Sequence, residues 1–151
     1  MALYNFDDRR IKWNTLALPP VGELKHLLFT ILNVDEENHI VHVLFKFSAN
    51  EKIILHRHMI HNNTFVVQGE HRLYEPDGTL KEIRPTGMYK STPPGDVHRE
   101  GGGPTRTWSC FSTCGAVTAC SMKSSTTTRM SSPRSVTPTS LAYIKRNKAF
   151  A

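Results

Sequence analysis

The 151-residue sequence contains no run of about 18 apolar residues, the length that a membrane-spanning helix needs. Residues 1–8 also lack the basic region and apolar stretch of a secretory signal. We therefore expect a cytoplasmic protein with no membrane partner. Only three cysteines are present, Cys110, Cys114 and Cys120. Their spacing matches no zinc motif, and their odd number argues against a disulfide framework.

Acidic residues are absent from the last third of the chain. Residues 1–100 contain 12 Lys and Arg and all 13 Asp and Glu, whereas residues 101–151 contain 7 basic residues and no acid. The net charge of +6 is therefore the sum of −1 for the first segment and +7 for the second. A near-neutral segment followed by a basic tail does not form a basic binding face, so we expect no nucleic-acid partner.

Short segments of strand-forming residues occur before Gly101 and predict an all-β protein. Pro76-Asp77-Gly78 predicts a turn between two of them. We expect residues 1–24 to form an N-terminal arm, residues 25–136 a single barrel or double-sheet roll, and residues 137–151 a short C-terminal helix that begins at Thr137-Pro138. The predicted strands are residues 27–32, 39–47, 52–56, 65–67, 72–74, 80–83 and 88–91.

Histidines gather at two places about forty residues apart. His56 and His58 are two positions apart, so on a strand both side chains point to the same face and can bind one metal ion. His98 follows the segment Pro93-Pro94-Gly95-Asp96-Val97. A third imidazole from a neighbouring strand would complete a site that leaves positions open for substrate or oxygen.

The glycines and prolines around these histidines resemble the two sequence motifs of the cupin superfamily. The first cluster with Gly69 is similar to G(X)5HXH(X)3–4E(X)6G, and the residues from Gly87 to His98 are similar to G(X)5PXG(X)2H(X)3N. The resemblance covers residues 25–102 and implies a single-domain jelly-roll β-barrel. It also implies that His56, His58 and His98 are metal ligands.

Three positions depart from these motifs. The opening glycine of the first motif is missing, with Ala49 or Asn50 near its place. Asn62 stands where the family places a glutamate ligand, and Gly102 stands where the second motif ends in asparagine. An amide is a poor ligand beside imidazole and carries no charge, so a three-histidine site is left. Neutral imidazoles suit iron, zinc, copper or nickel. Three protein ligands with open positions favour catalysis over a closed structural site.

Within the cupins, this ligand set is similar to that of dioxygenases that cleave a carbon–carbon bond beside a carbonyl, such as the diketone- and dihydroxyacetophenone-cleaving enzymes. The resemblance implies Fe(II), dioxygen and a small enolisable or aromatic ketone as substrate. It also implies a homodimer or higher homo-oligomer. The alternative is a non-catalytic binding module or sensor that holds zinc, and a metal-dependent isomerase or hydrolase also stays open.

Charged and aromatic residues near the motifs are candidates to orient a substrate. We expect Arg99 and Glu100, which follow a ligand, and Tyr89 to act in catalysis. His61 could be a fourth ligand or a hydrogen-bonding neighbour of the site, but its odd offset from His58 turns it away on a regular strand. Further candidates on predicted strands are Lys46, Gln68 and Arg72.

The segment after Gly103-Pro104 has an unusual composition. Residues 105–135 contain 15 Ser or Thr in 31 positions, which is typical of a flexible tail. A jelly roll, however, cannot lose its last strands without leaving an open sheet edge. Codons for residues 121–131 can be chosen so that the neighbouring frame encodes Y-E-I-L-D-D-D-E-D-V-L. We therefore hypothesise that residues 104–134 are a frame-shifted reading of the last strands. A single undisturbed frame in the source DNA would contradict this hypothesis.

Overall fold

The computed structural model describes residues 6–18 and 22–114, in which all regular secondary structure is β-strand. The predicted helix at residues 137–151 lies outside these residues. Within them, no helix is long and apolar enough to cross a membrane. The strands are β1 (Asn14–Leu18), β2 (Gly22–Asp35), β3 (Ile40–Phe47), β4 (His56–Arg57), β5 (His61–Gln68), β6 (Glu70–Tyr74), β7 (Leu80–Pro85), β8 (Tyr89–Thr92), β9 (Val97–Gly102) and β10 (Thr107–Cys114).

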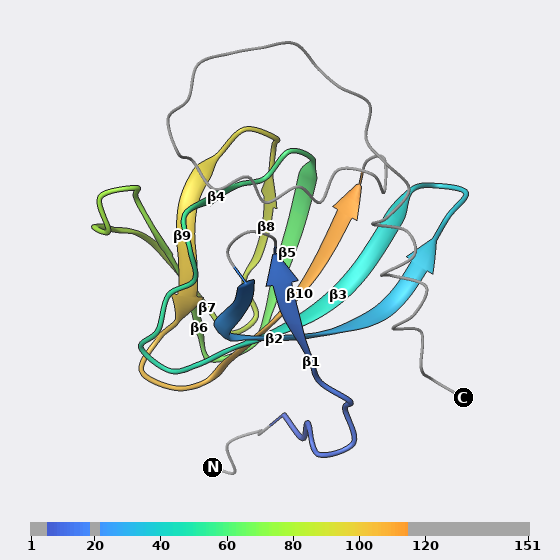
Figure 1. The fold of residues 1–151 in the computed structure, drawn as a ribbon, viewed down its shortest axis with the longest axis horizontal. Helices are drawn as coiled ribbons and strands as arrows, with labels where there is room; N and C mark the ends of the chain where they lie inside the picture. Colours follow the sequence, from blue (N-terminus) through green and yellow to red (C-terminus); the bar gives the residue numbers. More distant parts are fainter. Residues whose placement is uncertain (1–5, 19–21, 115–151) are drawn as a thin grey trace.

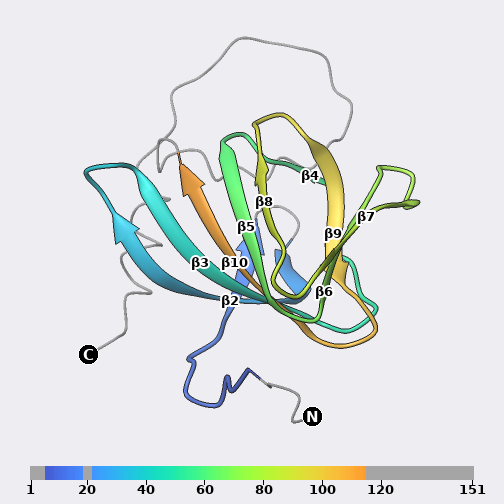
Figure 2. The same ribbon diagram turned by 180° about the vertical axis from the view of Figure 1, so that it is seen from behind.

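The strands form two antiparallel sheets. The large sheet has the order β1-β2-β3-β10-β5-β8, and the small sheet has the order β4-β9-β6-β7. The curved large sheet forms one wall, and β4 and β9 lie across from it (Figures 1 and 2). The predicted all-β jelly-roll architecture is confirmed.

The core lies between the inner faces of the two sheets. On the large sheet, Leu27, Phe47 and Thr107 are neighbours in register and are buried. The Phe47 ring stacks on the His71 ring of the small sheet, with the ring centroids 5.2 Å apart. Leu27 and Phe47 also pack in one apolar cluster with Leu24 and Ile53. Burying each of these large apolar side chains contributes about 1.5–3 kcal/mol, so this cluster stabilises the packing of the large sheet against the segment that precedes β4.

The outer face of β3 and β10 is covered by residues 6–13. Asp8 forms an ion pair with Lys46 and accepts a hydrogen bond from Trp108 Nε1 at 3.3 Å. The Phe6 and Trp108 rings pack together, with their centroids 6.0 Å apart. Lys46 also lies over the ring of Trp13, 5.3 Å from its centroid. This part of the predicted N-terminal arm therefore packs on the sheet.

Six of the predicted strands coincide with observed strands, and so does the turn. Gly78 has a φ of +92°, and Asp77 accepts a hydrogen bond from the Thr79 amide, as expected of a β6–β7 turn. Gly69 joins β5 to β6 with a φ of +88°, and a Cβ there would lie 2.6 Å from the Arg106 carbonyl oxygen. Both the backbone angle and the lack of space require glycine at this motif position.

The strand predicted at residues 52–56 is wrong. Lys52 forms only an isolated bridge with Gly101, and β4 begins at His56. The chain crosses β9 so closely here that a Cβ on Gly101 would lie 1.9 Å from the Glu51 carbonyl oxygen. The segment packs against β9 through the Ile53 amide, which donates to the Glu100 carbonyl. Apolar residue types alone do not distinguish such a crossing segment from a strand.

Four strands were not predicted, namely β1, β4, β9 and β10, and the most central of them is β10. It lies within the Ser/Thr-rich segment, yet it pairs with β3 on one side and with β5 on the other. Its sequence, TWSCFSTC, contains aromatic and β-branched residues that suit a strand. A strand therefore fills the place that the jelly roll requires. The frame-shift hypothesis stays a prediction, and its residues beyond 114 lie outside the described part of the chain.

Candidate metal centre

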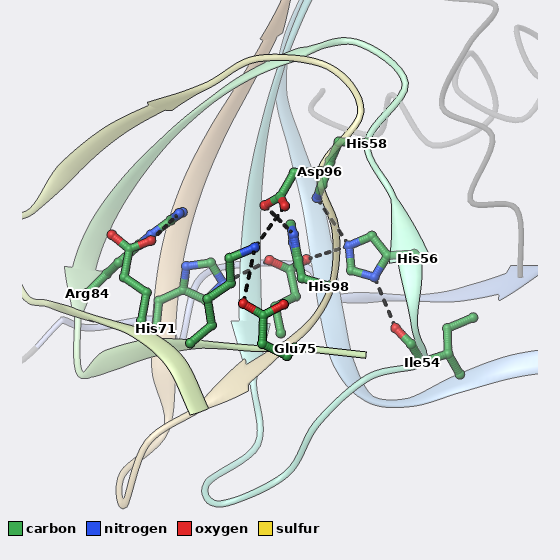
Figure 3. Close-up of polar contacts among 11 residues, drawn as sticks. Ile54, His56, His58, His71, Glu75, Arg84, Asp96 and His98 are labelled. Carbon is green, nitrogen blue, oxygen red and sulfur yellow. Dashed lines mark hydrogen bonds and ion pairs between the residues drawn. The ribbon is translucent and has the colours of Figure 1, made fainter. Parts of the chain in front are cut away.

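His56, His58 and His98 lie together at one end of the small sheet. His56 on β4 is directly opposite His98 on β9, and His58 follows β4. The three ring centroids are 4.9, 5.0 and 5.1 Å apart, and Nε2 of His56 lies 3.1 Å from Nε2 of His58. The three rings point toward one another in Figure 3. The structure thus brings together the three predicted ligands.

Hydrogen bonds orient the rings of His56 and His98. Nδ1 of His56 donates to the Ile54 carbonyl at 3.0 Å, and Nδ1 of His98 lies 3.0 Å from the Asp96 carboxylate (Figure 3). Both partners accept hydrogen bonds, so Nδ1 carries the proton in each ring. The neutral tautomer of each then has its lone pair on Nε2, the nitrogen available to bind a metal.

The loop before β9 holds the backbone of His58, which carries the third imidazole. The Gly95 amide donates to the His58 carbonyl at 2.8 Å, and the His58 amide donates to the Asp96 carbonyl at 3.4 Å. Gly95 has a φ of +105°, which favours glycine and lets the loop turn back toward His58. These two bonds tie the backbone of the first motif to that of the second.

Asp96 is a site residue that the sequence analysis missed. Its carboxylate contacts His98, and it also accepts a hydrogen bond from Lys81 Nζ at 2.9 Å. Lys81 in turn lies 3.7 Å from Glu75. Burial would raise the pKa of Asp96, but the bonds from Lys81 and His98 lower it below its usual value. The signal in the sequence was its place two residues before His98, on the same side of an extended chain.

Glu100 places a buried carboxylate beside the imidazoles. Its Oε1 lies 3.4 Å from Nε2 of His56, and its Oε2 lies 2.8 Å from Nε2 of His71, which donates. The ligand atoms of His56, His58, His98 and Glu100 all lie within 4.8 Å of one another. Burial would raise the pKa of Glu100, but the contacts with His56 and His71 hold it well below its usual range. The carboxylate is therefore charged at neutral pH.

The electrostatics of the cluster keep two of the imidazoles neutral. Burial lowers the pKa of His58 to about 4 and also lowers that of His98. Burial is also the largest single influence on His56 and lowers its pKa, but the contacts with Glu100, the Ile54 carbonyl and Asp96 together outweigh burial and raise the pKa of His56. At neutral pH, His58 and His98 thus present unprotonated nitrogens to the centre of the cluster.

These donors fit a transition-metal ion. Two nitrogens that bind one ion at about 2.0–2.1 Å and at right angles lie about 3.0 Å apart, close to the observed 3.1 Å between the Nε2 atoms of His56 and His58. Converging imidazoles beside an anion match the preferences of iron, zinc, copper and nickel.

The other predicted site residues lie elsewhere. Arg99 stands between His98 and Glu100 on β9, so its side chain points to the opposite face. Tyr89 is 61% exposed and is paired with the exposed Phe65 on the outer face of the large sheet. The structure therefore brings Glu100, but not Arg99 or Tyr89, to the cluster. The catalytic roles of these residues stay predictions.

Four further candidates from the sequence, for a ligand or for orienting a substrate, contact residues outside the cluster. His61 Nε2 lies 2.6 Å from Ser91 Oγ, outside the cluster. Gln68 accepts a hydrogen bond from the Phe6 amide, and Arg72 pairs with Glu70. Lys46 is held by Asp8 on the outer face.

No protein-family model matches the sequence, and no curated protein matches it either. Solved structures, by contrast, share its fold. An RmlC-like cupin from Shewanella frigidimarina is 20% identical, with a TM-score of 0.52 over 77% of this chain and 93% of that one. A proposed acetylacetone dioxygenase from Methylibium petroleiphilum is 14% identical, with a TM-score of 0.52 over 76% and 82% of the two chains. An RmlC-like cupin from Ralstonia eutropha is 14% identical, with a TM-score of 0.53 over 68% and 64%.

Identities this low establish the fold alone. The neighbours are consistently cupin or RmlC-like proteins, and the first- and second-motif histidines meet on one face of the small sheet. The described part of the chain therefore has the cupin fold, with a histidine and glutamate cluster suited to a metal ion.

Proposed function

We propose that the protein is a metal-dependent cupin enzyme, an Fe(II) dioxygenase that cleaves a carbon–carbon bond beside a carbonyl in a small enolisable or aromatic ketone. The observation that carries this proposal is the convergence of three imidazoles on one point beside the buried Glu100. The fold shared with a proposed acetylacetone dioxygenase adds support for the reaction class. Because fold alone does not determine chemistry, the donor atoms of the cluster carry more weight for the proposed reaction than the shared fold.

The residues of the cluster have separate tasks in this proposal. His56, His58 and His98 would hold the ion, and Asp96 and the Ile54 carbonyl keep two of these rings in the binding orientation. A bound ferrous ion would supply Lewis acidity toward a carbonyl oxygen and redox chemistry with dioxygen.

Access to the cluster is asymmetric. His56 and His98 are buried, whereas His58 is partly exposed. Substrate and dioxygen would therefore approach from the side of His58. The buried side holds the carboxylate of Glu100, whose negative charge favours a divalent cation beside neutral imidazoles.

The test is oxygen uptake by protein purified anaerobically and loaded with Fe(II). We expect dioxygen consumption on addition of pentane-2,4-dione or a hydroxyaryl ketone, and from the dione one carboxylic acid and one α-oxo aldehyde for each dioxygen consumed. His98→Ala should abolish uptake, whereas His61→Ala, which changes a histidine outside the cluster, should retain it. Tightly held zinc, with no uptake across a panel of ketones, would instead favour a non-catalytic binding module.

A further inference from the structure

The carboxylate that cupin-like motifs place on β5 is missing here, because Asn62 occupies that position. Three neutral imidazoles would leave both charges of a divalent ion uncompensated inside the protein, which is energetically unfavourable. Glu100 is a carboxylate of the same cluster, but it comes from β9 on the opposite sheet.

The position of Glu100 on its strand directs it to the cluster. His98 and Glu100 are two residues apart on β9, so their side chains share a face. The same spacing relates His56 and His58 in the first motif. Each motif thus contributes two side chains to one point, and the four donor atoms lie within 4.8 Å of one another.

The tautomer of His56 determines whether its Nε2 has a proton to share with Glu100. Nδ1 of His56 donates to the Ile54 carbonyl, so Nε2 of the neutral ring has no proton and carries a lone pair. This Nε2 atom lies 3.4 Å from Oε1 of Glu100 and 3.1 Å from Nε2 of His58. Acceptors at these distances repel unless a proton or a metal cation lies among them. When a metal ion occupies Nε2, no proton remains there to bind Glu100.

The other oxygen of Glu100 is already held. His71 Nε2 donates to Oε2 at 2.8 Å, and the His71 ring stacks on Phe47 in the core. The carboxylate is therefore fixed with Oε1 directed toward the imidazoles, an orientation suited to a metal ligand whose remaining oxygen accepts a hydrogen bond.

We propose that Glu100 is the fourth protein ligand of the metal ion and replaces, from β9, the carboxylate that is absent at Asn62. The inference rests on the proposed metal-binding function. Four protein donors leave two positions of a six-coordinate ion for substrate and dioxygen. His71 is then a positioning residue that acts through Glu100.

Titration with Co²⁺ tests the ligand directly, because its visible d–d spectrum reports the coordination sphere without any need for activity. We expect Glu100→Gln to change this spectrum and to weaken Co²⁺ binding by at least about 10-fold. Glu70→Gln, a carboxylate on the same sheet but outside the cluster, should leave both unchanged. His71→Gln should weaken binding while the wild-type spectrum is retained.

A second carboxylate position provides a rescue experiment. In the double variant Asn62→Glu/Glu100→Gln, the carboxylate returns to the position of the motif, and we expect much of the lost affinity to be recovered. A wild-type Co²⁺ spectrum in Glu100→Gln would overturn the inference.

A crystal structure of the Zn²⁺-loaded wild-type protein decides the question even if the variants fail to fold. The inference predicts Oε1 of Glu100 at about 2.0–2.2 Å from zinc. A three-histidine site with Glu100 more than about 3 Å away would overturn it and leave the proposed metal site intact. If the wild-type protein binds no divalent ion, the proposed function fails together with this inference.

Discussion

The buried polar groups on the inner faces of the two sheets are arranged differently. On the small sheet, the imidazoles and the carboxylate of Glu100 converge on one another. On the large sheet, Leu27, Phe47 and Val66 are apolar, and the buried polar side chains beside them are those of threonine, serine and asparagine. Within the described part of the chain, Asn62 Oδ1, Thr64 Oγ1 and Ser109 Oγ have no hydrogen-bond partner. Polar burial alone does not indicate a metal site, whereas convergence of donors does.

The largest expected effect comes from removing a convergent donor. His98→Ala should abolish stoichiometric metal binding, because it removes one of the imidazoles that face the ion. His61→Ala on the large sheet should keep one ion per chain, since His61 pairs with Ser91 outside the cluster. Metal analysis after dialysis measures both. Equal losses in the two variants would show that the coordination sphere assigned to the small sheet is wrong.

The next effect is the pH dependence of stability in the metal-free protein. The pKa of His58 falls to about 4 on folding, from an unfolded value near 6.5. Between these values the unfolded chain binds more protons, so the free energy of unfolding rises with pH, by on the order of 3 kcal/mol for this group. The lowered pKa of His98 acts in the same direction, and the raised pKa of His56 opposes it.

We therefore expect the stability from His58 to be complete above about pH 6.5 and to be lost as the pH falls through about 4. Urea unfolding at pH 7 and pH 5 measures the difference, and His58→Gln should reduce the slope. Equal or higher stability of the wild-type protein at pH 5 would contradict this prediction.

A smaller effect should follow from removing the carboxylate that orients His98. Asp96→Asn removes the negative charge but keeps a side chain of similar size. We expect metal affinity to fall by about 10- to 100-fold, as is usual for a hydrogen-bonding partner of a ligand. Competition with a chelator measures the change. Glu75→Gln, a carboxylate that reaches Asp96 only through Lys81, should have a much weaker effect.

The smallest effect concerns two threonines on the inner face of the large sheet. Both Thr64 and Thr107 are fully buried, but Thr107 Oγ1 bonds to the backbone of Glu70 whereas Thr64 Oγ1 has no partner in the described residues. Thr107→Val should lower the free energy of unfolding by about 1–3 kcal/mol. Thr64→Val should be neutral or raise it by up to about 1 kcal/mol. Urea unfolding of the pair measures whether the hydroxyl of Thr64 is isolated, and equal destabilisation would show that it is not.

Much of the site could be predicted from local spacing. His56 and His58 share a face because side chains alternate on an extended chain, and the glycines at 69 and 95 occur where the backbone needs a positive φ. These features depend on near neighbours in the sequence. The predicted meeting of the two motifs was also correct, because it rested on the order and separation of two patterns.

The rest depended on contacts between distant strands. β10 forms because β3 and β5 supply partners on both of its edges, which its Ser- and Thr-rich composition does not reveal. Asp96 and Glu100 act through His98 and His71, so their roles depend on which side chains the fold places beside them. Tyr89 was predicted from its residue type, but the face it occupies is set by its pairing with Phe65.

Calorimetric titration of the metal-free wild-type protein with Zn²⁺ or Co²⁺ tests the central claim most directly, because it counts the ions that the convergent face of the small sheet binds. We predict saturable binding of one ion per chain, which is lost in His98→Ala. The absence of saturable binding by correctly folded wild-type protein would contradict the assignment of this cluster as a metal centre.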